Sequence, residues 1–228
     1  MTPLDLPDEP RWVEAHGIAA HPTSWRRALE HGGVIGHARA KLAVIHGAPP
    51  PATIDALARE LADHTLLVAS EPLRAALDAS GRRPLRAILH TLADPAALPE
   101  LDGATLLGPD VSLAHVPADL ADELAVARTL GPIWTVFVDG EPVSFAYAPW
   151  RSARWFDVSV DTLPAARQLG LGAIVASTMI HAERAAGREP VWGADEHNLA
   201  SLRLADRLGF VPIDELWVAP PTRGDALH

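Results

Sequence analysis

The stretch that decides the fold reads Thr162-Leu163-Pro164-Ala165-Ala166-Arg167-Gln168-Leu169-Gly170-Leu171-Gly172, between a predicted strand and a predicted long helix. The start of a helix exposes backbone N–H groups without acceptors and carries a partial positive charge. The glycines at 170 and 172 remove side chains where the backbone must approach a bulky anion, and Arg167 adds a charged fork of donors. The stretch therefore predicts a pyrophosphate seat at the beginning of the helix.

Two other phosphate-binding loops have different patterns. The chain has neither the G-x-x-x-x-G-K-[ST] of a nucleotide P-loop nor the G-x-G-x-x-G of a dinucleotide turn at this place. Taken alone, R-x-x-G-x-G is equally compatible with glycines that only form a tight turn between strand and helix. Elements elsewhere in the chain must therefore distinguish a phosphate seat from a simple turn.

The second half of the chain alternates predicted strands and helices around this loop. A helix over 118–130 comes first, and Asp139-Gly140 predicts a hairpin turn. Apolar residues at helical spacing predict the long helix over 169–186. The other predicted elements are strands at 133–138, 143–148, 155–160, 191–194 and 210–218 and a helix at 198–208.

The first half shows a similar alternation, which favours an α/β layer. Residues 1–20 read as an irregular lead-in, and Thr23 or Ser24 is expected to cap a short helix that ends at Gly32-Gly33. Further elements are predicted as strands at 42–46, 65–69 and 85–92 and helices at 53–63 and 71–79. Because Pro and Gly punctuate residues 95–109, we predict an N-terminal α/β region over 1–108 and a second domain over 109–228.

A second motif lies downstream of the loop: Asn198-Leu199-Ala200-Ser201, then Leu204, then Leu208-Gly209-Phe210. In this order the loop and the motif resemble the GNAT superfamily of N-acetyltransferases, over roughly residues 133–218. The stretch Asp157–Pro164, with Pro190-Val191-Trp192, is similar to the zwittermicin-resistance type of GNAT protein. The resemblance implies a mixed-sheet GNAT fold in the C-terminal half. It leaves open that the N-terminal region is a degenerate second copy of that fold.

The resemblance also implies acetyl-CoA as the acyl donor and places its binding residues. In the superfamily the loop binds the pyrophosphate, the preceding strand offers backbone groups to the pantetheine arm, and the later helix lies alongside that arm. Arg203 or Arg207 is expected either to meet the adenosine phosphates or to stay solvated. The expected cofactor-binding residues are Val158, Ser159, Val160, Thr162, Arg167, Gln168, Leu169, Gly170, Leu171, Gly172, Asn198 and Ser201.

The resemblance does not identify the residue that protonates the CoA thiolate. Many GNAT enzymes protonate the CoA thiolate with a Tyr seven residues after the motif Asn, and this chain has Ala205 there. Either Ser201, a water or another group replaces that Tyr, or the protein turns over slowly, or it only binds an acyl-CoA. We therefore keep two functions open: an N-acetyltransferase that acts on a primary amine by direct transfer, and a non-catalytic acyl-CoA-binding or regulatory module.

The expected base is Asp157. This residue, Ser159 and Asp161 alternate to one face of the predicted strand, where a carboxylate is available to accept the proton of an amine. The alternative is that Asp157 pairs with Arg154. Three aromatic residues are expected to line the acceptor pocket because they flank this strand: Tyr147, Trp150 and Trp155.

The composition of the chain limits the classes of ligand and partner that we expect it to bind. A net charge of -10 over 228 residues is unfavourable for nucleic-acid binding. The chain has no cysteine, its 11 histidines form no recognisable ligand pattern, and we predict no metal. No apolar run approaches the roughly 20 residues that span a membrane, and the acidic, Pro-containing stretch Met1–Asp8 has no signal-peptide core. We expect a cytoplasmic protein that acts on a small-molecule amine, alone or as a homodimer.

Overall fold

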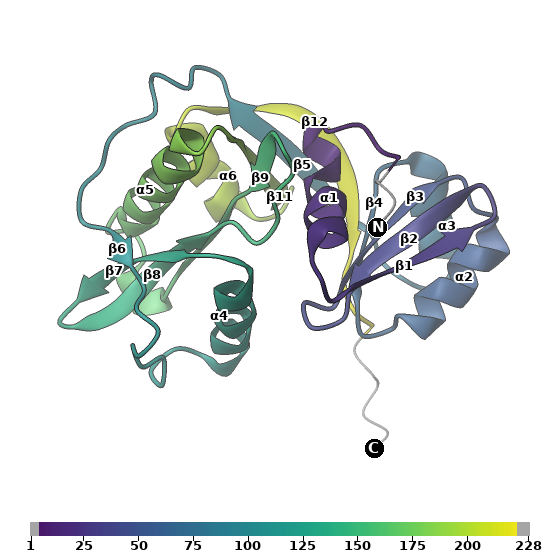
Figure 1. Ribbon diagram of the computed structural model, residues 1–228, viewed down its shortest axis with the longest axis horizontal. Coiled ribbons are helices and arrows are strands. Elements are labelled where there is room, and N and C mark those ends of the chain that lie inside the picture. Colours follow the sequence, from purple (N-terminus) through teal and green to yellow (C-terminus); the bar gives the residue numbers. More distant parts are fainter. Residues whose placement is uncertain (1–4, 223–228) are drawn as a thin grey trace.

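The computed structural model describes residues 5–222 and forms a curved mixed sheet with helices on both sides (Figure 1). Met1–Leu4, part of the stretch read for a signal peptide, lies outside the described residues. No helix within 5–222 is long and apolar enough to cross a membrane. The elements of the first half are η1 (Pro10–Trp12), α1 (Val13–Ala20), β1 (Ser24–Leu29), β2 (Gly32–His37), β3 (Leu42–Gly47), α2 (Pro51–Glu60), β4 (Thr65–Val68), α3 (Glu71–Ala79) and β5 (Leu85–Leu92).

The second half has a similar succession of elements, with an extra short strand before its first helix and with its third strand divided in two. Its elements are β6 (Thr105–Leu106), α4 (Ala118–Leu130), β7 (Ile133–Val138), β8 (Glu141–Tyr147), β9 (Trp155–Asp157), β10 (Ser159–Thr162), η2 (Pro164–Ala166), α5 (Leu171–Ala185), β11 (Glu189–Asp195), α6 (Leu199–Arg207) and β12 (Phe210–Ala219). The predicted mixed α/β fold is confirmed, whereas the division at residue 108 stays a prediction.

The last strand of each half is inserted into the other half. The main sheet has the order β1-β2-β3-β4-β12-β5-β11-β9, so β12 lies between β4 and β5, and β5 lies between β12 and β11. The two inserted strands pair with each other antiparallel, from Phe210 opposite Leu92 to Val218 opposite Leu85. Each half also has one parallel pair of strands: β3 is parallel to β4 in the first half, and β9 is parallel to β11 in the second. The halves are therefore joined through a shared, intertwined centre.

The helix predicted over 24–30 was wrong, because these residues form β1, paired with β2. The glycines that read as a helix stop are strand positions where neighbours come close. A Cβ at Gly36 would lie 2.2 Å from the indole of Trp25, and one at Gly32 would lie 2.2 Å from the carbonyl oxygen of His46. Glycine is needed at these positions because neighbouring strands pack closely there. In the sequence alone, the same glycines resemble the end of a helix.

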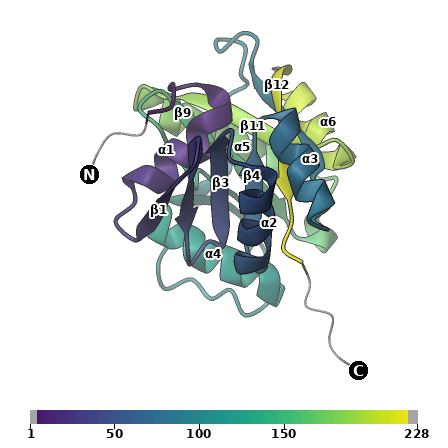
Figure 2. The ribbon, with the colours of Figure 1, turned by 90° about the vertical axis from the view of Figure 1, so that its right-hand side faces the viewer.

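The irregular lead-in predicted over 1–20 was also wrong from Pro10 onward, where η1 and α1 form. Helix α1 buries Val13, Ala15 and Ile18 in a cluster that includes Trp150 and Val191 of the second half. In Figure 1, α1 lies between the two halves, and α2 and α3 cover the outer face of the N-terminal strands. Figure 2 shows those outer helices beside β3 and β4. Since α1 is covered from two sides, its sequence has no polar stripe that would have revealed it.

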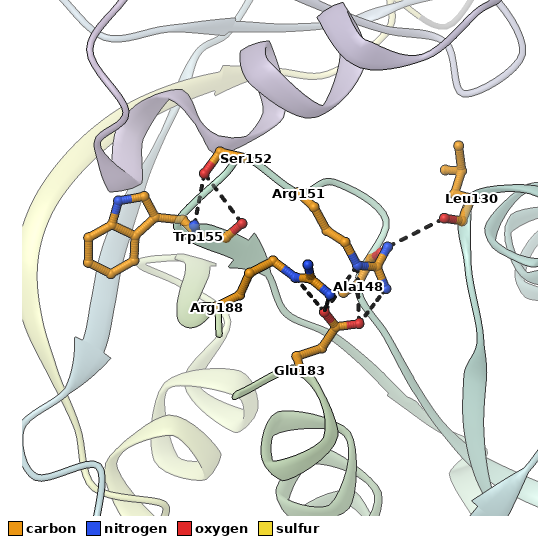
Figure 3. A network of polar contacts seen from close by, with 7 residues as sticks. All are labelled: Leu130, Ala148, Arg151, Ser152, Trp155, Glu183 and Arg188. Carbon is orange, nitrogen blue, oxygen red and sulfur yellow. Dashed lines mark hydrogen bonds and ion pairs between the residues drawn. The ribbon is translucent and has the colours of Figure 1, made fainter. Parts of the chain in front are cut away.

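An ion-pair network closes the end of α5 against the connection between β8 and β9 (Figure 3). Glu183 is 7% exposed, and its carboxylate accepts hydrogen bonds from Arg151, at 2.6 Å from Nη2, and from Arg188, at 2.9 Å from Nε. Arg151 also donates to the carbonyl oxygens of Ala148 and Leu130. The network fixes the loop that leads into β9, and hence the position of the strand that carries Asp157.

Candidate functional site

The third strand of the second half breaks at Val158, and this break creates the site. β9 pairs with β11 through Asp157 opposite Val191, whereas β10 leaves β11 and pairs only with β8. A cavity of about 700 Å³ opens between the separated strands. Eleven of the twelve residues predicted to bind the cofactor line it: Val158, Ser159, Val160, Thr162, Arg167, Gln168, Gly170, Leu171, Gly172, Asn198 and Ser201. The twelfth, Leu169, is 65% exposed and is not part of the lining.

The glycine loop presents unpaired donors to this cavity. Gln168 and Gly170 have left-handed backbone conformations, with φ of 65° and 80°, and Gly170 is the N-cap of α5. The backbone N–H groups of residues 168–172 donate to no acceptor in the described part of the chain, whereas Ala173 donates to the carbonyl oxygen of Gly170. Five successive free N–H groups at a helix start form an anion-binding concavity.

Three arginines border the same cavity: Arg167, Arg203 and Arg207. Arg167 donates from Nε to the carbonyl oxygen of Thr162 at 3.1 Å, which leaves the rest of its guanidinium available. None of the three forms an ion pair with a carboxylate of residues 5–222. The arginines on α6 were expected either to meet phosphates or to stay solvated, and the structure places both at the cavity.

Ser201 is held by two neighbours. Its backbone N–H donates to Asn198 Oδ1 at 3.1 Å, and the Trp192 indole donates from Nε1 to Ser201 Oγ at 2.9 Å. Because Oγ accepts from Trp192, its own proton is free to donate elsewhere. Ala205, in contrast, is fully buried in the core and contributes nothing to the lining. Ser201 is therefore one of three hydroxyl residues in the lining, with Ser159 and Thr162, and Thr162 Oγ1 is already paired with Ser144.

Two carboxylates, Glu123 and Asp161, line the same cavity, and the charge of Arg167 acts on Asp161. Phe156, Val158 and Val160 pack toward α5, so Asp157 and Asp161 face the other side of the sheet, as the alternation predicted. There Tyr147 donates its hydroxyl at 2.6 Å from Glu123 Oε1 and at 3.1 Å from Asp161 Oδ2. Burial and these two carboxylates raise the pKa of Tyr147 above its usual value. Burial and the charge of Glu123 raise the pKa of Asp161.

The sequence did not identify Glu123, on α4, as a site residue. It lines the cavity together with Asp161, although the two residues are 38 positions apart in the chain (161 minus 123). The helix over 118–130 was predicted, but its two other acidic residues, Asp119 and Asp122, gave no reason to single out this one. Only the packing of α4 against the face of β8 that carries Tyr147 brings it to the site.

Asp157 lies beside the cavity, where the strand breaks. Burial, opposed by the N–H of Val158 and reinforced by the charge of Glu123, raises the pKa of Asp157 to about 7. The alternative partner, Arg154, is engaged elsewhere: its guanidinium lies over the Trp155 ring at 4.6 Å. A carboxylate that titrates near neutral pH next to a cavity is suited to accept a proton.

All three aromatic residues expected in the acceptor pocket, and Asp157, lie outside the cavity lining. Trp150 is 4% exposed and packs edge-on against His37 at 5.4 Å between ring centres. Trp155 donates from Nε1 to the carbonyl oxygen of Asp8 at 3.1 Å. Both tryptophans connect the two halves of the chain, whereas Tyr147 reaches the cavity through its contacts with Glu123 and Asp161.

Comparison with protein families matches residues 130–218 to the model described as GNAT acetyltransferase. Over these residues the chain is similar to GNAT acetyltransferases. The match begins at the end of α4 and ends in β12, so it contains the splayed strand, the glycine loop and the Asn198 motif. The narrower zwittermicin-resistance group is not distinguished by this match.

Solved structures extend the likeness in fold to nearly the whole chain. A GCN5-related N-acetyltransferase-like protein from Streptococcus suis has 20% identity and a TM-score of 0.68, covering 94% of this chain and 93% of its own. A GCN5-related N-acetyltransferase from Kribbella flavida has 17% identity and a TM-score of 0.62, covering 95% and 96%. A tandem GNAT protein from the clavulanic acid biosynthesis pathway has 17% identity and a TM-score of 0.54, covering 94% and 95%. A search of curated proteins gave no match.

Proposed function

We propose that this protein is an N-acetyltransferase that moves the acetyl group of acetyl-CoA directly to a primary amine of a small molecule or peptide. The observation that carries the proposal is the row of unpaired backbone N–H groups over residues 168–172 of the described chain, next to Arg167, at a cavity that Glu123 and Asp161 also line. The N–H groups and Arg167 suit a pyrophosphate, and the two carboxylates suit a cation. The GNAT match over residues 130–218 supports acetyl transfer in general.

The chain's own groups fit acetyl-CoA along this cavity. The loop N–H groups and Arg167 would hold the pyrophosphate, and Arg203 or Arg207 the adenosine phosphates. The edge of β10, which is unpaired with β11, would offer backbone groups to the pantetheine amides beside Asn198. When bound, the cofactor supplies a thioester carbonyl for the amine to attack.

Asp157 and Ser201 would handle the protons. An ammonium must lose a proton before its nitrogen can attack, and Asp157, with a pKa of about 7, is partly ionised at neutral pH and accepts that proton. As the N–C bond forms, the C–S bond breaks with its electron pair staying on sulfur, and the nitrogen loses its second proton to solvent. The Ser201 proton, left free by the Trp192 contact, protonates this sulfur, and solvent restores the hydroxyl.

The acceptor end favours an amine over an alcohol. Glu123 and Asp161 converge on the single proton of Tyr147, and neither forms an ion pair with a Lys or Arg of residues 5–222. The charge of Arg167 acts on Asp161, and a protonated amine would add a second positive charge to these two carboxylates. The likeness of Asp157–Pro164 to the zwittermicin-resistance type suggests an amine-bearing natural product as one candidate class.

A turnover assay separates this function from its rival, a non-catalytic acyl-CoA-binding module, which the buried Ala205 favours. Purified protein is incubated with acetyl-CoA and a panel of primary amines that includes diamines, amino sugars, amino acids and peptides. The release of free CoA is then followed. We expect amine-dependent release that Asp157→Asn abolishes. Tight acetyl-CoA binding without release by any amine would favour the binding module.

A further inference from the structure

The C-terminal end of α1 presses against the loop between β8 and β9. A Cβ at Gly17 would lie 2.7 Å from the backbone nitrogen of Arg151 and 2.8 Å from Cβ of Trp150. Trp150 is buried, and its carbonyl oxygen accepts the backbone N–H of Asp157 at 2.9 Å. The contact between the two halves therefore leads, through Trp150, directly to β9.

Two histidines of the N-terminal half meet at this contact. His21 follows the last residue of α1, and His37 is the last residue of β2. Their rings pack edge-on with centres 4.6 Å apart, and the His37 ring packs in the same way against Trp150, at 5.4 Å. His37 is 1% exposed, whereas His21 is half-buried and lines a surface pocket of about 200 Å³ together with Trp150. Solvent therefore reaches the pair of rings through His21.

The hydrogen bonds of the pair leave room for one proton on each ring. The backbone N–H of Thr23 donates to His21 Nδ1 at 3.3 Å, and the backbone N–H of Ala40 donates to His37 Nδ1 at 3.0 Å. Because both Nδ1 atoms are acceptors, each neutral ring carries its proton on Nε2. His37 Nε2 lies 3.0 Å from Thr23 Oγ1 and 3.1 Å from His21 Nδ1, and Thr23 Oγ1 lies 2.9 Å from that Nδ1. In this triangle His37 and Thr23 donate, and His21 Nδ1 accepts.

A second proton on either ring does not fit this arrangement. An imidazolium donates from both nitrogens and accepts at neither. A charged His37 would therefore set its Nδ1–H against the backbone N–H of Ala40, and a charged His21 would set its own against that of Thr23. Either event breaks hydrogen bonds at the contact between the halves.

The charged groups around the pair offer a second proton no counter-charge. Burial, then His21, then the charge of Arg39 lower the pKa of His37. From the C-terminal half, Arg151 comes close to this contact, but its guanidinium is held by Glu183 at 2.6 Å. No carboxylate of residues 5–222 forms an ion pair with His21 or His37. The hydrogen bonds and the charges therefore favour the same neutral state.

We infer that His21 and His37 form a pH-sensitive switch that holds the N-terminal half against the loop before β9 while both rings are neutral. Below about pH 6.5, the usual pKa of histidine, an open state takes up a proton that the closed state rejects. The open state therefore gains population as the pH falls. Opening separates the His37 ring from Trp150, whose carbonyl oxygen holds the Asp157 N–H. This switch is independent of the chemical role proposed for Asp157.

Hydrogen exchange in the full-length protein tests the switch. The protection factor of the Asp157 N–H is measured by NMR in the wild type and in His37→Gln. Between about pH 7.5 and about pH 5, the wild-type factor should fall by about fivefold or more relative to that of the variant, because glutamine does not titrate. The ionisation of Asp157 itself is common to both proteins and cancels in this ratio. His21→Gln should remove part of the same pH dependence, whereas His31→Asn, an exposed control, should keep it.

Nitrogen-15 NMR of the histidine rings adds a check on the wild type alone. At about pH 7.5 both His21 and His37 should carry their proton on Nε2. A proton on Nδ1 of His37, or a charged His37 ring in the closed state at about pH 6.5, would overturn the switch. The same pH dependence of Asp157 protection in the wild type and in His37→Gln would also overturn it. Neither measurement involves acetyl-CoA or an amine, so a failure of the proposed acetyl transfer would leave both results unchanged.

Discussion

The indole nitrogen of Trp192 lies 2.9 Å from Ser201 Oγ, and both residues line the cavity between β10 and β11. Trp192 is 2% exposed and also packs edge-on against Phe210, so its N–H is fixed in direction. A hydroxyl that accepts from a rigid donor has one favoured direction for its own proton. In the proposed reaction, this relationship would let Ser201 act as the acid, since position 205 holds an alanine and not a tyrosine.

Replacing that hydroxyl should slow the reaction without weakening cofactor binding. Ser201→Ala should lower kcat by about 100-fold, the lower end of what a positioned acid contributes. The deficit should shrink above about pH 8.5, since a thiolate leaves without protonation once the pH exceeds the usual pKa of a thiol. Trp192→Phe keeps the ring but removes the donor, and should cost less than Ser201→Ala. A deficit in Ser201→Ala that is independent of pH would contradict an acid role.

The rate should depend on the ionisation of Asp157. Since burial and Glu123 raise the pKa of Asp157 to about 7, kcat should rise with pH and level off above this value. Glu123→Gln removes one of the charges that raise this pKa, so the rise of kcat with pH in this variant should occur at lower pH than in the wild type. Steady-state rates between about pH 5.5 and pH 9, at saturating acetyl-CoA, measure this. A wild-type profile that is flat across this range would exclude Asp157 as the base.

The raised pKa values of the Glu14 and Asp157 carboxyls predict a loss of stability with rising pH. Unfolded carboxyls titrate near pH 4, whereas the folded pKa values are about 8 for Glu14 and about 7 for Asp157. The folded state therefore binds more protons between these limits, and the free energy of unfolding falls as pH rises from about 4 to about 8. Glu14→Gln should raise that free energy at about pH 8.5 by about 1 kcal/mol or more, and change it little at about pH 5. Urea unfolding at both pH values checks this, and equal gains at both would contradict it.

Glu183 should be needed for stability. Burial opposes its ionisation, but hydrogen bonds and charges from Arg151 and Arg188 lower the pKa of Glu183 below its usual value. Glu183→Gln leaves two guanidiniums without their counter-charge and should lower the free energy of unfolding by about 2–4 kcal/mol. Glu189→Gln, which breaks the more exposed pair with Arg184, should cost less than about 1 kcal/mol. If urea unfolding shows that Glu183→Gln and Glu189→Gln lower the free energy of unfolding equally, the network in Figure 3 contributes no more than an exposed ion pair.

Local sequence patterns predicted the C-terminal half well. The turn at Asp139-Gly140, the apolar stripe of α5 and the glycine loop each act within a few residues, so their structure follows from neighbours in the chain. The first two strands and α1 were missed for the opposite reason. Gly36 is explained by a tryptophan eleven positions away (36 minus 25), and α1 is stabilised by the far half of the chain.

The site was predicted only where a motif marks it. The cofactor end rests on Arg167–Gly172 and Asn198, which carry their chemistry in contiguous residues. The carboxylates of the site depend on Glu123, which meets Tyr147 and Asp161 only after α4 has packed onto the sheet. The exchange of β5 and β12 between the halves likewise leaves no local trace, because either strand would read the same in its own half.

The measurement that tests the account most directly is calorimetric titration of acetyl-CoA into the wild-type protein and Arg167→Glu. The structure predicts one site per chain, because only the C-terminal half has the row of free N–H groups. Arg167→Glu should weaken binding by about 100-fold or more, since it turns a charge-assisted contact into repulsion. Arg59→Glu, an exposed change on α2 away from the cavity, should bind like wild type. Unchanged affinity in Arg167→Glu would contradict the placement of the pyrophosphate at residues 167–172.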